Sequence, residues 1–198
     1  MGSILANLFM ANHSKLIEKV VFTSPGPLFP LQKGLEDLEP PDSLQLIEPT
    51  YSNREGNKKA YNIRSIVMLK MANVFGSKLA ADEEADNFAT FLNASLSKST
   101  VKDTTLKSPM EAGAGFYSHV MTLKSLNYIE DMRSPLEGIQ IPVLIMKGQY
   151  DSQKWGYTSE YIELYSNHKL VIIPDAGHSI VIEKPALYIK TIRNFLNQ

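Results

Sequence analysis

The sequence contains no cysteine, and this absence removes several chemistries at once. A chain without cysteine cannot form a disulfide framework, use a thiol nucleophile or build a cysteine-based zinc site. Metal catalysis would have to rest on four scattered histidines. We therefore expect neither a metal site nor a cofactor.

The sequence also lacks an excess of charge of either sign. Lysine and arginine number 20, aspartate and glutamate number 21, and the isoelectric point is about 6.4. No basic stripe stands out that would attract nucleic acid or an anionic membrane. The expected ligand is a small-molecule or short-peptide substrate.

Long apolar runs are missing as well, since none approaches the roughly 20 residues of a membrane-spanning helix. No basic residue precedes the apolar part of residues 1–10, as it would in a secretory signal peptide. Ala6 stands where N-myristoylation needs serine or threonine. These absences predict a cytoplasmic protein that does not interact with membranes.

The residues that are present suit a globular core. At 198 residues and 43% hydrophobic composition, the chain can bury a core as one domain or as a small core with a lid. Continuous apolar runs at 20–22, 141–146 and 170–173 are typical of strands buried on both faces of a parallel sheet. Helices are predicted near residues 4–9, 60–74, 82–92, 116–127, 156–166 and 185–196.

The order of these elements predicts an α/β fold with a mostly parallel sheet and an inserted helical cap. Residues 28–56 are rich in proline and acidic residues, so the chain is expected to leave the sheet layer there. We predict core at 1–30, a helical cap or lid at 31–134, and the rest of the core at 135–198. The apolar stripe expected to form the core of the first cap helix comprises Ala60, Ile63, Ile66, Val67, Met71 and Val74.

Two polar residues follow two consecutive predicted strands. Asp151 lies just beyond the strand at 141–146, and His178 lies just beyond the strand at 170–173. Open parallel sheets bind ligands at the edge formed by the carboxyl ends of their strands. A carboxylate there can orient an imidazole, while the imidazole takes a proton from a hydroxyl nucleophile. We predict that Asp151 and His178 form such a catalytic pair.

A single aspartate or histidine at such a position more often caps a turn or packs against the end of a strand. The combination of strand-Gly-x-x-Asp with strand-Asp-x-Gly-His, separated by one helix, is much rarer than either part and favours the catalytic interpretation. Asp175 is nearer to His178 in sequence, but we expect it to shape the turn and rank it second as the orienting acid.

The pattern resembles the α/β hydrolases with a helical cap, in which serine, aspartate and histidine follow one another along the chain. Their nucleophile lies in a Gly-x-Ser-x-Gly motif, and the opening Met1-Gly2-Ser3 resembles the residues directly after that serine. The resemblance implies that the N–H of Met1 lines the oxyanion hole. Ser3 itself is expected to cap a helix, and Ser24 has no glycine elbow around it.

Within that superfamily the sequence is most similar to the proline iminopeptidases, also called prolyl aminopeptidases. Residues 141–151 and 176–185 carry most of the match. The resemblance implies that acidic residues near the pocket hold the free amino terminus of the substrate. Ser152 stands where one such acid would follow the aspartate, and a cap acid would fall near His119; Glu111 is the nearest carboxylate upstream and a weak candidate for substrate binding.

If the chain begins at Met1, the resemblance implies that the nucleophile and five earlier strands are absent, so this chain alone is expected to be inactive. An unpaired apolar edge at residues 20–24 invites pairing with another chain, and an oligomer formed through it is expected. Two hypotheses stay open: a parent serine hydrolase that cleaves peptide or ester bonds, or a non-catalytic fragment or interaction module. An aspartate nucleophile would instead make a dehalogenase or an epoxide hydrolase.

Overall fold

The computed structural model describes residues 2–29, 34–49, 61–106 and 115–198. Contacts divide the chain into two compact units, each with a hydrophobic core of its own. Unit 1 comprises Met1–Pro49, Thr100–Lys102 and Glu130–Gln198. Unit 2 comprises Thr50–Ser99 and Asp103–Ile129. The role of residues 31–134 as a lid stays a prediction.

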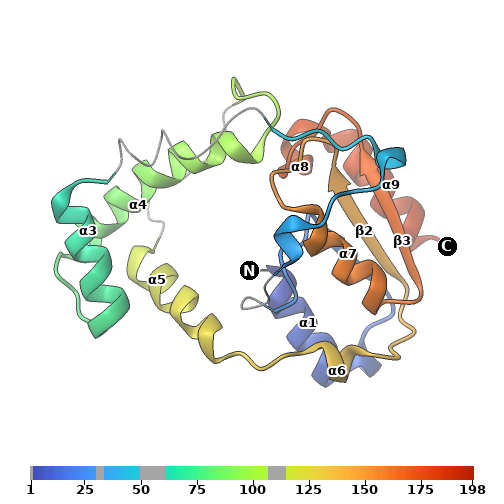
Figure 1. Cartoon of the computed structure of the whole chain (residues 1–198), viewed down its shortest axis with the longest axis horizontal. Helices are drawn as coiled ribbons and strands as arrows, with labels where there is room; N and C mark the ends of the chain where they lie inside the picture. The colour runs from blue at the N-terminus through green and yellow to red at the C-terminus, as the bar shows by residue number, and fades with distance from the viewer. Residues whose placement is uncertain (1, 30–33, 50–60, 107–114) are drawn as a thin grey trace. The chain divides into compact units, whose positions relative to one another are not determined.

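Unit 1 is built on a parallel sheet whose described strands follow the order β1-β2-β3. Figure 1 shows β2 and β3 side by side. The strands are β1 (Val20–Thr23), β2 (Val143–Gly148) and β3 (His168–Ile173). Every residue of β2 is buried, because this strand lies between the other two and has helices on both of its faces. The prediction of an α/β fold with a parallel sheet is confirmed.

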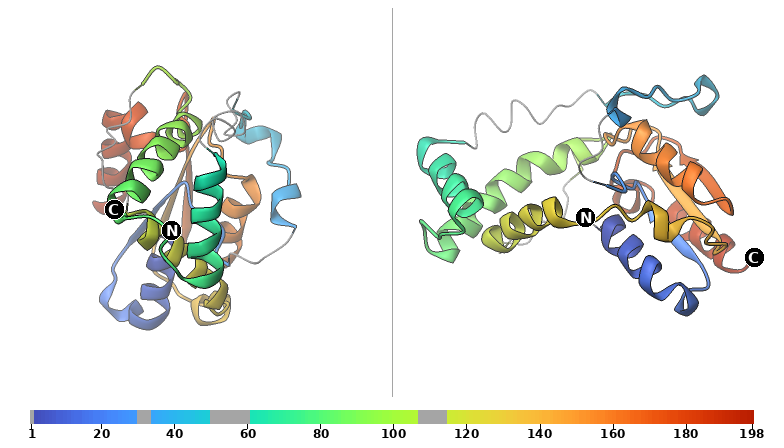
Figure 2. Two further views of the ribbon diagram at one scale, coloured as in Figure 1. Left: turned by 90° about the vertical axis from the view of Figure 1, so that its left-hand side faces the viewer. Right: turned by 60° about the horizontal axis from the view of Figure 1, so that its bottom comes forward.

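Helices cover both faces of the sheet in unit 1 (Figure 2). Side chains of a strand alternate between the two faces, so β2 contributes to two separate layers. Leu144 and Met146 pack on one face with Ile180 and Phe195, which lie on the last two helices. The described helices of this unit are α1 (Gly2–His13), α6 (Arg133–Leu136), α7 (Trp155–Leu164), α8 (Ile180–Glu183) and α9 (Pro185–Leu196), with 3₁₀ turns at Ser14–Leu16, Leu35–Asp37 and Asp42–Leu44.

The opposite face of the sheet carries an aromatic cluster. Phe22 of β1 meets Tyr161 of α7 and Tyr165, the residue directly after α7, with ring centroids 4.8 and 6.0 Å apart. The two tyrosine rings are fully buried, so their hydroxyl groups need partners within the protein. Burial also raises the pKa of Tyr161 to about 12, which keeps its hydroxyl protonated at neutral pH.

Asn7 of α1 provides a partner for each of the two hydroxyls, and Ser3 is a second partner of Tyr161. Its amide nitrogen donates to the hydroxyl of Tyr161 at 3.1 Å, and its amide oxygen accepts from the hydroxyl of Tyr165 at 2.6 Å. Asn7 is itself fully buried. One side chain therefore joins α1 both to α7 and to the residue that directly follows α7.

Unit 2 is helical in its described part, with α3 (Ile63–Lys70), a π-helical turn (Met71–Phe75), α4 (Asp82–Leu96) and α5 (Phe116–Ser125). Asn62 and Ser65 form a capping box that begins α3. The core of this unit consists of Met68, Ala72, Ala85, Ala89, Phe116 and Val120. Short 3₁₀ turns lie at Ser97–Thr100 and Leu126–Tyr128.

The predicted buried stripe of α3 is wrong. Ile63 is 83% exposed and Val74 is 65% exposed, whereas Met68 and Ala72 are buried. The face of α3 that carries Met68 packs against α4 and α5. Which face is buried is therefore determined by the packing of these helices and not by the largest side chains of α3. Across the described ranges, no helix combines the length and the apolar character needed to cross a membrane.

We predict that Asn7→Ala lowers the free energy of unfolding by about 1–3 kcal/mol, because it leaves the buried hydroxyl of Tyr165 without its partner, while the hydroxyl of Tyr161 keeps its hydrogen bond with Ser3. Urea denaturation measures the change. Asn12→Ala is the matched control, since Asn12 lies on the same helix, is exposed and donates only to Leu8 O at 2.8 Å. Equal effects of the two substitutions would show that the buried network contributes nothing.

Candidate active site

The site forms where β2 and β3 end at the same edge of the sheet. Gly148 closes β2 and lies so near the following loop that a Cβ there would fall 2.1 Å from the carbonyl oxygen of Gly177. The two loops are joined by a backbone hydrogen bond from Tyr150 N–H to Ala176 O at 2.8 Å. Because residue 148 has no side chain, the loops that carry the predicted acid and base approach each other closely.

Asp151 and His178 meet at this edge. The Oδ1 of Asp151 lies 3.0 Å from the Nδ1 of His178. The same oxygen accepts the backbone N–H of Gln153, also at 3.0 Å, so the carboxylate is held from its own loop as well. The structure brings together the two residues that the sequence predicts as a pair. Their catalytic role stays a prediction.

The exposures of the two side chains differ in a way that suits an orienting acid and a working base. The side chain of Asp151 is fully buried, whereas that of His178 is 33% exposed. With the Nδ1–H of a neutral ring donated to the carboxylate, Nε2 becomes the acceptor nitrogen. His178 can therefore take a proton from a group that approaches from outside.

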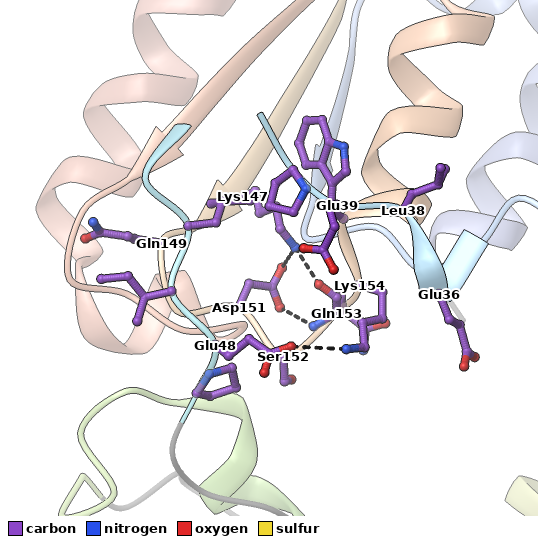
Figure 3. A pocket seen from close by; sticks show the side chains of 15 residues that line it. Glu36, Leu38, Glu39, Glu48, Lys147, Gln149, Asp151, Ser152, Gln153 and Lys154 are labelled. Carbon is purple, nitrogen blue, oxygen red and sulfur yellow. Dashed lines mark hydrogen bonds and ion pairs between the residues drawn. The ribbon is translucent and has the colours of Figure 1, made fainter. Parts of the chain in front are cut away.

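Lys147 is the residue that sequence reasoning missed. It belongs to β2, is 2% exposed, and donates from Nζ to Asp151 Oδ2 at 3.0 Å and to Gln153 O at 2.7 Å (Figure 3). Both oxygens of the Asp151 carboxylate are thus occupied. Lys147 directly follows the apolar run at 141–146, and β2 extends through it to Gly148; a lysine buried in a strand must find an opposite charge.

The charges of this cluster determine its protonation. Burial by itself would raise the pKa of the Asp151 carboxyl, but the hydrogen bond from His178 and the positive charge of Lys147 outweigh it and hold the pKa below its ordinary value. Burial lowers the pKa of the Lys147 ammonium, and the charge of Asp151 opposes this only in part. Asp151 is therefore a carboxylate at neutral pH and can stabilise a protonated imidazole.

Several solved enzymes share this architecture. An α/β hydrolase from a Medee basin deep-sea metagenome library matches with a TM-score of 0.52 and 19% identity, covering 100% of this chain and 62% of that one. The enol-lactonase from Burkholderia xenovorans LB400 matches with a TM-score of 0.51 and 17% identity, and the match covers 100% of this chain and 63% of that one. An esterase from Thermogutta terrifontis matches with a TM-score of 0.52 and 16% identity, and the match covers 99% of this chain and 61% of that one. The chain has the α/β-hydrolase fold.

Sequence likeness is more limited than this likeness of fold. A stretch of 63 residues is 32% identical to a Bacillus subtilis (strain 168) protein named as a 2-succinyl-6-hydroxy-2,4-cyclohexadiene-1-carboxylate synthase, and it covers 32% of this chain and 23% of that protein. No family model matches the chain. The chain also spans less than two thirds of the α/β-hydrolase structures named above.

Other predicted residues of the α/β-hydrolase site fall in different places. Met1 and Glu111 lie outside the described residues. Ser3 lies in the first turn of α1 and hydrogen-bonds Tyr161. The hydroxyl of Ser24 is buried without a partner, which keeps substrate away from it. Asp175 has a left-handed backbone with φ of 52° and pairs with Lys102 at 2.6 Å, so it shapes the turn.

A cavity of about 470 Å³ adjoins the Lys147–Asp151 pair (Figure 3). His178 is not among the described residues that line it. Its polar walls include three glutamates and two lysines, and Lys154 pairs with Glu48 at 3.2 Å. The lining residues are Glu36, Leu38, Glu39, Pro40, Leu46, Ile47, Glu48, Pro49, Lys147, Gln149, Asp151, Ser152, Gln153, Lys154 and Trp155.

In the parts of the chain that the structure describes, no group of three or more histidine, aspartate or glutamate side chains could hold a metal ion.

We predict that Lys147→Met lowers the free energy of unfolding by about 3–5 kcal/mol at pH 7, because it leaves a buried carboxylate without its cation. The loss should shrink toward pH 4. In the unaltered chain the lowered pKa of Asp151 gives stability above the ordinary carboxyl pKa of about 3.9, and this stability is lost as the pH falls through the folded-state value. In the variant the charge of Lys147 no longer lowers that pKa, so the destabilisation grows as the pH rises and Asp151 ionises.

Denaturant unfolding at pH 4 and pH 7 measures this difference. Lys154→Met is the matched control, because Lys154 is exposed and its pair with Glu48 is open to solvent. We expect it to change stability far less and by the same amount at both pH values. A loss for Lys147→Met that does not vary with pH would show that the charge of Asp151 is not what Lys147 stabilises.

Proposed function

We propose that the protein is a hydrolase in which Asp151 orients His178 and His178 moves the proton. The observation that carries the proposal is the 3.0 Å contact between Asp151 Oδ1 and His178 Nδ1 at the carboxyl edge of a parallel sheet. The pairing of a buried acid with a partly exposed base supports it, because this is the division of labour that the reaction needs. The α/β-hydrolase fold supports it at the level of the architecture.

The proposed reaction proceeds through an acyl-enzyme. The nucleophile is the serine of a Gly-x-Ser-x-Gly motif whose last glycine is Gly2. Nε2 of His178 takes the serine proton as the oxygen attacks the carbonyl carbon, and the resulting imidazolium gives that proton to the leaving group. The N–H of Met1 helps to hold the oxyanion. Water then releases the acyl group by the same route.

The narrower proposal concerns the substrate. The resemblance of residues 141–151 and 176–185 to proline iminopeptidases supports a substrate with an amino-terminal proline, and small esters are the alternative within the same mechanism. Ser152 departs from the acidic residue expected after Asp151, and it weakens the case for recognition of a free amino terminus. The substrate class is therefore tested separately from the mechanism.

We predict that His178→Ala and Asp151→Asn each lower kcat/KM by about 10³–10⁴-fold in the protein translated from the reading frame that includes the codons before Met1. Those codons should encode Gly-x-Ser in frame. His13→Ala is the matched control, since His13 is an exposed histidine at the end of α1. Unchanged activity of the His178 variant, or an upstream sequence without serine at that position, would contradict the proposed mechanism.

Turnover of two substrate panels decides the substrate class. We expect release of nitroaniline from prolyl-p-nitroanilide if the iminopeptidase proposal holds, and release of nitrophenol from p-nitrophenyl acetate and butyrate if the enzyme is an esterase. Release from esters alone removes the peptidase proposal and leaves the hydrolase proposal intact. A protein with the upstream serine that turns over none of these substrates would favour the non-catalytic interaction module.

A further inference from the structure

The loop that carries His178, residues 174–179, is held by a distant segment of the chain. The carbonyl oxygen of Thr100 accepts the backbone N–H of Ser179 at 2.7 Å, and the hydroxyls of the two residues lie 2.9 Å apart. Thr100–Lys102 belongs to unit 1 by its contacts, although the residues on either side of it in sequence belong to unit 2. This segment is a second support of the histidine loop, besides the contact with the loop that follows β2.

Glu183 of α8 joins the loop to that segment. Its Oε2 accepts the backbone N–H of Gly177 at 2.5 Å, and its Oε1 accepts the backbone N–H of Lys102 at 2.8 Å. A carboxylate that accepts two N–H groups forms charge-assisted bonds, which are shorter and stronger than bonds between neutral groups. One side chain therefore fixes the residue that directly precedes His178.

The packing around Gly177 shows why such a bond is needed. A Cβ at this position would lie 2.9 Å from both Lys102 N and Thr100 O, so only glycine allows the segment to approach. Glycine, however, has the largest backbone freedom of any residue. Because this flexible residue directly precedes His178, another group is needed to hold its peptide plane. The carboxylate of Glu183 does so by accepting the N–H of Gly177.

The side chain of Lys102 adds a separate, exposed contact. Its Nζ lies 2.6 Å from Asp175 Oδ1 and 4.7 Å from the ring centroid of Tyr150. These contacts use the lysine side chain, whereas the bond to Glu183 uses the lysine backbone. The two contributions can therefore be separated by substitution.

We infer that Glu183 is a positioning residue: by holding the Gly177 N–H it keeps the ring of His178 in hydrogen-bonding distance of Asp151. This inference rests on the proposed function, because positioning His178 matters for activity only if His178 transfers protons. Its test, however, does not require a measurement of turnover. The hydrogen bond between His178 and Asp151 can be observed directly in this chain.

The test follows the Nδ1 proton of His178 by ¹H NMR, since a proton held between imidazole and a buried carboxylate resonates downfield of the amide region and exchanges slowly with water. The resonance is assigned by its loss in Asp151→Asn. We expect Glu183→Ala to broaden the resonance or raise its exchange rate at least about tenfold, the factor that corresponds to one lost hydrogen bond. Glu183→Gln keeps the size of the side chain but only one acceptor oxygen, so a smaller increase is expected.

Lys102→Ala is the matched control, because it removes the contacts to Asp175 and Tyr150 but leaves the backbone N–H that Glu183 accepts. Lys19→Ala is a control for stability alone, since Lys19 Nζ donates to the carbonyl oxygens of Phe195 and Leu196 at the end of α9. Neither should change the resonance. If Glu183→Ala unfolds the chain, Glu183→Gln decides the outcome.

An unchanged exchange rate in a folded Glu183 variant would overturn the positioning role. An increase of the same size in Lys19→Ala would overturn it too, because the effect would then follow from lost stability. If the resonance depends on Glu183 but the complete protein has no hydrolase activity, the proposed function fails and the inference about geometry stands. Absence of the resonance in the unaltered chain would contradict the Asp151–His178 bond itself.

Discussion

The close approach of two backbones at the carboxyl edge of the sheet is the constraint on which the site depends. Gly148 leaves no room for a Cβ, because the carbonyl oxygens of Ala176 and Gly177 occupy that space. The bond from Tyr150 N–H to Ala176 O then fixes the distance between the loops. Asp151 and His178 reach each other only because both loops are held at this separation.

Burial of a carboxylate at that point requires compensation, and the chain provides it from three directions. Lys147 supplies a buried positive charge to one oxygen, and His178 with the Gln153 N–H occupies the other. The cluster of Lys147, Asp151 and His178 has no net charge as long as the imidazole is neutral. In the proposed reaction, proton transfer to His178 adds one positive charge at the edge of the sheet, where a developing oxyanion would balance it.

The histidine loop and α1 illustrate how polar groups set positions in this fold. Asn7 joins α1 to α7 and to Tyr165, and Glu183 joins the loop before His178 to residues 100–102. Each of these side chains binds two partners, so each fixes both the distance between the two segments it joins and their relative orientation. The apolar layers would allow small rotations that these bonds prevent.

Much of unit 1 was predictable, because continuous apolar runs report buried parallel strands and local motifs mark the strand ends. The sequence by itself determined that Asp151 and His178 follow adjacent strands and hence share one edge. Only the tertiary structure decided that Lys147 neutralises Asp151, that Glu183 holds Gly177, and that α3 buries Met68 rather than Ile63. Those outcomes depend on contacts between residues far apart in the chain, and periodicity carries no information about which distant group a side chain will meet.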